Sequence, residues 1–269
     1  MKLLLALLFL VQTGGAATAV LDGAKVHYVS AGKGPESVVL IHGWTCDHTL
    51  WGPQIKALSA KYRVLALDLP GHGASDPAPD YSINRFARAV EAVMRAEKVE
   101  RAVLAGHSMG GVVMLEFLRL YPEKAAGIIA VDAMFIDTAR AAAGFGPVAA
   151  RFQGPEALEN RRKMVEGMFT GATSEEVRAR IRKVMLGTAP ETAAGAMQGM
   201  ANPAAWGDDV HEAPFIQIAA ATSQHITEDG MKRRFPRAKL VRIPETGHFL
   251  HLEKPSEVNR VMLEWLASR

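Results

Sequence analysis

Nearly continuous apolar runs recur along the chain and alternate with stretches of helical periodicity. Such runs, in which polar positions do not alternate with apolar ones, are typical of strands buried on both faces of a parallel sheet. Strands that alternate with helices indicate an α/β fold built around that sheet. The runs that predict buried strands are Val38–Ile41, Val64–Leu67, Ala102–Ala105, Ile128–Val131, Pro214–Ala219 and Ala238–Ile243.

The segments around these runs carry helix and turn signals. Residues 83–97 have apolar side chains at helical spacing, and Ser82 is placed to cap them. A second helix is predicted at Met109–Leu120, before Tyr121-Pro122, and a closing helix at Glu257–Leu266. Near the N-terminus, residues 20–29 read as two short strands joined by a tight turn at Asp22-Gly23.

The alternation of strands and helices stops at about Ala133 and resumes after residue 207. Residues 134–207 are rich in Ala, Met and Arg, and they include the predicted helices Ala157–Met168 and Ser174–Met185. We interpret this segment as a helical cap inserted between two parts of one α/β core, residues 20–133 and 208–269. Periodicity leaves open a second interpretation, in which the helices only decorate the core.

The first residues resemble an export signal. Lys2 precedes the apolar run Leu3–Val11, and Ala17-Thr18-Ala19 offers small residues for cleavage. We therefore expect a signal peptide at residues 1–19 and a secreted or periplasmic protein. An uncleaved membrane anchor and a start codon placed too early are the alternatives.

Composition narrows the choice of partners and cofactors. The chain has 269 residues, 49% of them apolar, and a formal charge of +3, which gives no electrostatic case for nucleic acid. Cys46 is the only cysteine, so no internal disulfide can form. No glycine-rich dinucleotide loop is present, and we expect no cofactor. The expected partner is a small-molecule acyl substrate.

The strongest chemical motif is Gly106-His107-Ser108-Met109-Gly110, which has the form G-x-S-x-G. It follows a predicted buried strand and opens a predicted helix, the context of a nucleophile elbow. A sharp strand-to-helix turn leaves no room for side chains two residues before and two residues after the serine, which explains the glycines. We predict Ser108 as the nucleophile.

A serine hydroxyl needs a base and a site for the oxyanion. His248, in the loop after the last predicted strand, is the candidate base, and His251 is a weaker alternate. Acyl transfer also needs two N–H donors directed at the developing oxyanion. The Met109 amide follows the nucleophile, and the Trp44 amide lies in the loop after Val38–Ile41, so we predict these two as the oxyanion hole.

Four segments together resemble the α/β-hydrolase superfamily. They are His42-Gly43-Trp44, Asp68–Ser75, Gly106–Gly111 and Gly247–Pro255. The resemblance covers about residues 20–266 apart from the insertion. It implies an eight-stranded, mostly parallel sheet with helices on both faces and a helical cap. It also assigns His42 and His72 to structural turns, so we interpret the clustered metal-ligand types His42, Asp47, His48 and His72 without a metal.

The third member of the predicted triad departs from that family's pattern. Most relatives carry an Asp after the seventh strand, where this chain has Ser223. Asp132, after Ile128–Val131, is our preferred acid, because some relatives carry it there. Glu228 and Asp229 are alternatives. Two further possibilities are a neutral partner for the histidine, Ser223 or Gln224, and a loss of catalysis.

The predicted reaction is hydrolysis of a carboxylic ester or lactone through an acyl-enzyme on Ser108. A serine at this position disfavours epoxide hydrolase chemistry, for which relatives use Asp. The alternatives are a ligand-binding protein on a hydrolase scaffold and a cofactor-free acyltransferase or C–C bond hydrolase. Side chains that the pattern offers for an apolar substrate pocket are Met134, Phe135, Phe152, Met164, Met168, Phe169 and Trp206. Simple helix core is the more common role of Met and aromatic residues at such spacings.

Overall fold

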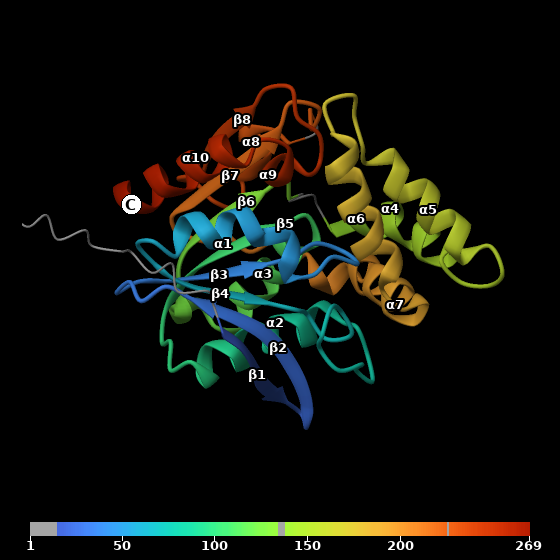
Figure 1. Cartoon of the computed structure of the whole chain (residues 1–269), viewed down its shortest axis with the longest axis horizontal. Coiled ribbons are helices and arrows are strands. Elements are labelled where there is room, and N and C mark those ends of the chain that lie inside the picture. The colour runs from blue at the N-terminus through green and yellow to red at the C-terminus, as the bar shows by residue number, and fades with distance from the viewer. Residues whose placement is uncertain (1–14, 134–137, 225) are drawn as a thin grey trace, which may run out of the picture.

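One mixed sheet forms the centre of the molecule (Figure 1). The structure, a computed structural model, describes residues 15–133, 138–224 and 226–269, without the side chains of 138–143. In these residues eight strands pair in the order β1-β2-β4-β3-β5-β6-β7-β8. The β1–β2 and β2–β4 pairs are antiparallel and all others are parallel. The strands are β1 Gly15–Leu21, β2 Ala24–Ala31, β3 Ser37–Ile41, β4 Arg63–Leu67, β5 Ala102–His107, β6 Ala125–Val131, β7 Phe215–Ala220 and β8 Lys239–Ile243.

Helices cover both faces of the sheet, which explains the continuous apolar runs. Val38 and Leu40 of β3 pack with α1 (Gly52–Leu58) and α10 (Pro255–Ser268) in one apolar cluster. Their neighbours Val39 and Ile41 pack with α2 (Ile83–Ala96) and α3 (Met109–Leu120) in the other. Successive strand residues face opposite sides, so both sets must be apolar. The predicted fold class, an α/β hydrolase with an eight-stranded sheet, is confirmed.

Between β6 and β7 the chain leaves the sheet and forms a group of helices, to the right in Figure 1. Within the described residues these are α4 Thr138–Arg151, α5 Ala157–Gly167, α6 Glu175–Gly187 and α7 Pro190–Ala201. We call them the cap helices. Thr188, after α6, donates a hydrogen bond from Oγ1 to the Thr45 carbonyl at 2.9 Å. The cap helices thus contact the loop at the carboxyl end of β3.

The remaining short elements lie in the connections between these strands and helices. They are the 3₁₀ helices η1 His48–Trp51, η2 Pro122–Lys124 and η3 Pro203–Ala205, and the helices α8 Glu228–Lys232 and α9 Leu250–Glu253. No helix of the described residues has the length and apolar character needed to cross a bilayer.

The N-terminal hairpin is longer than predicted. Strand β1 begins at Gly15, not at Val20, and pairs with β2 from Gly15–Ser30 to Leu21–Ala24 around the expected Asp22-Gly23 turn. Ala19 is buried against the core. The small side chains before Val20 therefore do not end the strand, because backbone pairing along β2 continues past them. Residues 1–14 lie outside the described residues, and removal of residues 1–19 stays a prediction.

Candidate active site

The turn from β5 into α3 presents Ser108 in a strained backbone conformation. Its φ is 52° and its ψ is −115°, values that side-chain-bearing residues rarely adopt. A Cβ on Gly106 would lie 2.6 Å from the Gly110 carbonyl oxygen, and a Cβ on Gly110 would lie 2.5 Å from the Ile41 oxygen. Both contacts are too short for any side chain, so both glycines of the motif are needed to form the turn.

The loop after β3 lies directly against this turn. A Cβ on Gly43 would lie 3.2 Å from the Ser108 Cβ. The next residue, Trp44, has a backbone N–H that donates no hydrogen bond within the described part of the chain. Met109 is the first residue of α3, a position whose N–H has no partner inside the helix. Two amides beside the serine are therefore available to an oxyanion.

Two buried histidines build the turns around the Gly43 loop. His42 accepts a hydrogen bond at Nε2 from the Leu69 amide (2.9 Å) and donates from Nδ1 to the Gly43 carbonyl (2.8 Å). His72 donates from Nδ1 to the Pro70 carbonyl (3.1 Å). Burial lowers the pKa of His42 and lowers that of His72 to about 3. Both imidazoles are neutral and structural.

His248 and Asp132 meet at the carboxyl edge of the sheet. His248 donates from Nδ1 to Asp132 Oδ2 at 2.7 Å. Asp132 is 3% exposed and also accepts hydrogen bonds from the Ala220 amide on Oδ1 and from Ser223 Oγ on Oδ2, each at 2.9 Å. Burial works to raise the pKa of Asp132, but these donors and the neighbouring imidazole outweigh it and hold that pKa below its ordinary value. A carboxylate, not a carboxylic acid, faces His248.

Three of the four alternatives to Asp132 lie away from His248. Glu228 and Asp229 are exposed in α8, where Glu228 pairs with Lys232 at 2.8 Å. Gln224 is exposed and donates to the Ala221 carbonyl. Ser223 does reach the site, but its hydroxyl contacts the Asp132 carboxylate. Of these four alternatives to Asp132, only Ser223 is therefore part of the site, as a second donor to the acid.

The imidazoles of His107, His248 and His251 lie close together beside the sheet edge, and no role was predicted for His107. His107, inside the Ser108 motif, donates from Nε2 to the His248 carbonyl at 2.9 Å. His251, the weaker candidate base, is 1% exposed and lies beside His107, with ring centroids 4.6 Å apart and ring planes tilted by 53°, whereas the imidazole that contacts Asp132 is that of His248. Burial lowers the pKa of His107 and lowers that of His251 to about 3. His107 occupies the first variable position of the G-x-S-x-G motif, and this place in the motif was the signal in the sequence that could have pointed to it.

A carboxylate that the sequence did not single out joins the cap helices to the histidine loop. Glu253 of α9 accepts from the Gly247 amide on Oε2 and from Thr173 Oγ1 on Oε1, each at 2.6 Å. Gly247 precedes His248, and Thr173 lies just before α6. On the other side of the site, Trp44 donates from Nε1 to the Ala193 carbonyl of α7 at 2.8 Å. The cap helices thus hold both the base loop and the oxyanion loop.

A cavity of about 420 Å³ contains the serine and its partners. Its described lining consists of Trp44, Ser108, Met109, Val112, Asp132, Phe145, Met164, Gly167, Met168, Thr170, Met197, Met200, Trp206, Thr222, Ser223 and His248. Both predicted oxyanion residues and all three predicted triad residues are in this set.

The predicted apolar pocket is right for three side chains and wrong for two. Met164, Met168 and Trp206 line the cavity. Phe152 is instead buried in a stack on Trp44, with ring centroids 4.9 Å apart. Phe169 lies outside the lining because the Arg178 and Arg182 guanidinium groups cover its ring. Met134 and Phe135 lie outside the described residues.

The structure groups the clustered metal-ligand types of the sequence differently. His48 forms a hydrogen-bonded group with His27 and Asp68, which were not in that cluster. His27 and His48 donate from Nδ1 to the two oxygens of buried Asp68, at 2.9 and 2.8 Å. The His48 and Ala74 amides donate to the same carboxylate at 2.7 and 3.0 Å. Each Asp68 oxygen therefore receives two donors, which fills its acceptor capacity. The group joins β2, η1 and the turn after β4.

Comparison with known proteins identifies the family. The model of the alpha/beta hydrolase family matches residues 38–261. The chain belongs to this family. It is similar to the dihydrolipoyllysine-residue acetyltransferase component of the acetoin cleaving system of Pseudomonas putida, with 30% identity over 87% of this chain and 64% of that protein. It is also 24% identical to bifunctional epoxide hydrolase 2 of Sus scrofa over 91% of this chain and 53% of that protein. The chain thus spans about half to two thirds of these two relatives.

Solved structures cover the chain more fully. A thermophilic esterase from Thermogutta terrifontis superimposes with a TM-score of 0.81 at 26% identity, over 94% of this chain and 98% of that one. Est816, described as an N-acyl homoserine lactone degrading enzyme, superimposes with a TM-score of 0.78 at 26% identity, over 92% of this chain and 99% of that one.

Proposed function

We propose that this hydrolase cleaves carboxylic esters or lactones through an acyl-enzyme on Ser108. The observation that carries the proposal is the convergence of a strained serine, two available amides and the His248–Asp132 pair on one cavity. A nucleophile, a base held by a carboxylate and an oxyanion site are the components that acyl transfer needs.

In the first half-reaction His248 accepts the Ser108 hydroxyl proton at Nε2 while Oγ attacks the ester carbonyl carbon. The Trp44 and Met109 amides donate to the resulting oxyanion. As the C–O bond to the leaving alcohol breaks, His248 returns its proton to the alkoxide. Asp132 accepts the hydrogen bond from Nδ1 throughout and stabilises the imidazolium. A water molecule, deprotonated by His248, then attacks the acyl carbon, and the proton returns to Ser108 Oγ.

Similar proteins include enzymes that act on esters and lactones, and the serine at position 108 favours this substrate class over epoxides. The Thermogutta protein is described as an esterase and Est816 as a lactone degrading enzyme. The pimeloyl-[acyl-carrier protein] methyl ester esterase of Methylococcus capsulatus is 41% identical over 100 residues, 37% of each chain. Epoxide hydrolases also share the fold, but Ser108 replaces the Asp nucleophile that epoxide opening uses in the family.

The test is labelling of the purified protein with a fluorophosphonate, followed by mass spectrometry. We expect one adduct, on Ser108, and none in a Ser108→Ala variant. Absence of the adduct in a protein with native circular dichroism would overturn the proposal and favour the ligand-binding alternative. Product analysis with an activated ester, with and without added alcohol, separates hydrolysis from acyl transfer: we expect the free acid as the main product in both.

A further inference from the structure

The cavity beside Ser108 has a distinctive chemical lining. Apart from the reacting groups and a few hydroxyl side chains, its described residues are apolar and come from α3, the cap segment and the loop after β3. Methionine is the most frequent type, at positions 109, 164, 168, 197 and 200. None of the described lining residues is a lysine, arginine or glutamate.

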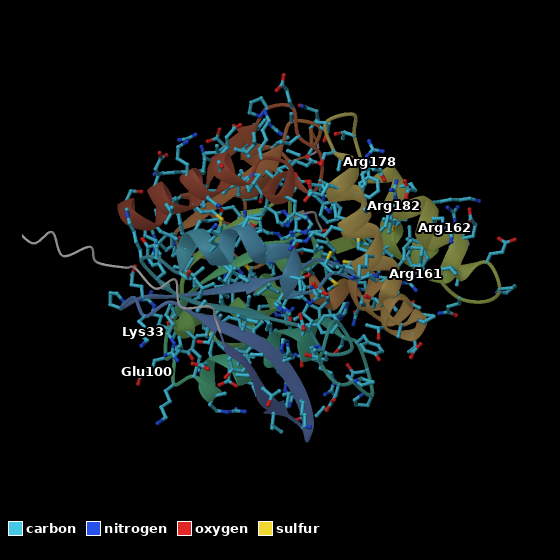
Figure 2. All side chains as sticks on the ribbon, viewed as in Figure 1. Lys33, Glu100, Arg161, Arg162, Arg178 and Arg182 are labelled. Atoms are coloured by element: carbon cyan, nitrogen blue, oxygen red, sulfur yellow. The ribbon has the colours of Figure 1, made fainter. Side chains whose placement is uncertain are left out.

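Four arginines of the cap helices are bound to other protein groups. Figure 2 labels them, on α5 and α6. Arg161 is 2% exposed and donates to the Met185 and Thr188 carbonyls, each at 2.8 Å. Arg178 donates to the Thr170 and Thr173 carbonyls, Arg182 pairs with Glu166 and Glu175, and Arg162 pairs with Glu159. None of these guanidinium groups is among the described lining residues.

The carboxylate in the lining does not offer a site for a substrate cation. Asp132 accepts from His248, Ser223 and the Ala220 amide, and it is almost fully buried. A substrate anion would meet this negative charge in a medium of low dielectric, where burial of an unpaired charge is strongly unfavourable. The described lining therefore disfavours both charged classes of substrate.

The apolar walls combine a rigid surface with adaptable ones. Trp206 stacks on Phe145, with ring centroids 5.6 Å apart, and donates from Nε1 to the Met200 carbonyl at 2.7 Å. The methionines of the lining have unbranched, polarisable side chains that adapt to ligand shape. If each non-hydrogen atom takes about the 30 Å³ of a water molecule, about 420 Å³ holds roughly 14 of them.

We propose that the substrate is an uncharged ester or lactone that carries a flexible alkyl chain of roughly 6–10 carbons in this methionine-rich cavity. This inference rests on the proposed function and adds the class of substrate. The described lining supplies apolar contact along the chain, and its polar groups are those at the ester group and a few hydroxyl side chains.

Two ester series test the chain length. One series is p-nitrophenyl esters of straight-chain acids from C2 to C14, and the other is alkyl acetates with chains of the same lengths. We expect kcat/KM to rise about fourfold per methylene in one of the series until the cavity is filled, and then to fall. A flat profile in both series, with Ser108 still labelled by fluorophosphonate, overturns the inference and leaves the proposed function intact. No labelling removes both.

A lysine introduced into the cavity lining tests whether the cavity disfavours charged substrates. Met168, partly exposed at the C-terminal end of α5, tolerates a cation because the helix dipole favours one there. For the wild-type enzyme we expect ω-carboxyl esters to react on the order of 100-fold more slowly than neutral esters of equal length. Met168→Lys should reduce the ratio of the neutral-ester rate to the ω-carboxyl-ester rate at least tenfold. Leu158→Lys, on the same helix but 53% exposed and outside the lining, should leave the ratio unchanged. Equal rates for both ester classes in the wild type contradict the proposal.

Discussion

At the scale of single residues, the acid of the triad is the position that the sequence left open. Asp132 follows β6, and Ser223 follows β7, the adjacent strand in the sheet. Because parallel strands end at the same edge, a carboxylate after β6 can contact the same imidazole as one after β7. Ser223 then serves the acid by donating a hydrogen bond to it.

Replacement of Asp132 by Asn should reduce kcat for an activated ester by about 10³–10⁴-fold, because the amide cannot stabilise the imidazolium. Steady-state kinetics at pH 8 measures this loss. Glu228→Gln and Asp229→Asn are the controls and should keep wild-type turnover, since both side chains are exposed in α8. Full turnover by Asp132→Asn would remove this residue from the mechanism.

At the scale of elements, the site depends on loops that the cap helices hold in place. The Trp44 indole and Thr45 carbonyl contact α7 and the end of α6, and Glu253 bonds both Gly247 and Thr173. These contacts explain why the inserted helices, which lie outside the sheet, belong to the candidate active site. Cap helices and catalytic loops are expected to lose order together.

Glu253→Gln tests this connection. In the variant, one of two donors, the Gly247 amide or the Thr173 hydroxyl, faces an NH₂ group instead of a carboxylate oxygen. Loss of a hydrogen bond to a charged group should lower the free energy of unfolding by about 1–3 kcal/mol, and kcat by roughly tenfold, because Gly247 precedes His248. Thermal unfolding and kinetics measure the two effects. Glu257→Gln, an exposed carboxylate of the next helix, is the matched control, and equal behaviour of the two variants would contradict the role of Glu253.

At the scale of the whole molecule, buried neutral imidazoles set the response to acid. The pKa values of His42, His72, His107 and His251 are lowered by burial, two of them to about 3. Below about pH 6.5 the unfolded chain binds protons that these folded imidazoles do not, so stability falls with pH down to the folded pKa. His48, whose pKa Asp68 raises against the effect of burial, acts in the opposite sense and offsets part of this loss.

Each imidazole contributes about 1.4 kcal/mol per pH unit to this slope. We therefore expect a marked fall in the denaturation midpoint between pH 7.5 and 5, measured in guanidinium chloride. His72→Asn should reduce the slope of the unfolding free energy against pH by the contribution of one imidazole. The variant should still fold, since the Asn amide can donate to the Pro70 carbonyl in place of Nδ1. An unchanged slope in this variant would show that His72 titrates normally in the folded protein.

Export of the protein is a further proposal at the scale of the whole molecule. We propose that residues 1–19 direct secretion, and intact-mass analysis of protein recovered outside the cytoplasm should then give a chain that begins at Val20. Such a chain keeps only the Val20–Lys25 and Leu21–Ala24 pairs of β1 and β2. A matched pair of chains beginning at Gly15 and Val20 should differ in thermal stability, with the longer one more stable. Recovery of only the full-length mass would argue against cleavage.

The sequence by itself predicted the buried strands of the core and the turn that presents Ser108, because both follow from local patterns. Unbroken apolar runs reflect burial on two faces, and the glycines around Ser108 reflect contacts that allow no side chain, 2.6 Å at Gly106. Helix α3 has the predicted bounds Met109–Leu120, and Ser82 caps α2 through the Arg85 amide as expected. Such signals need no knowledge of distant residues.

Only the tertiary structure decided which side chains meet. His248 and Asp132 are 116 residues apart, and their contact depends on the order of strands in the sheet. Phe152 and Phe169 share the composition of the pocket-lining residues but are covered by Trp44 and by two arginines, which no pattern along the chain reveals. Glu253 and His107 likewise act across loops. Burial and partner choice are properties of packing in three dimensions, whereas the elements that pack are encoded locally.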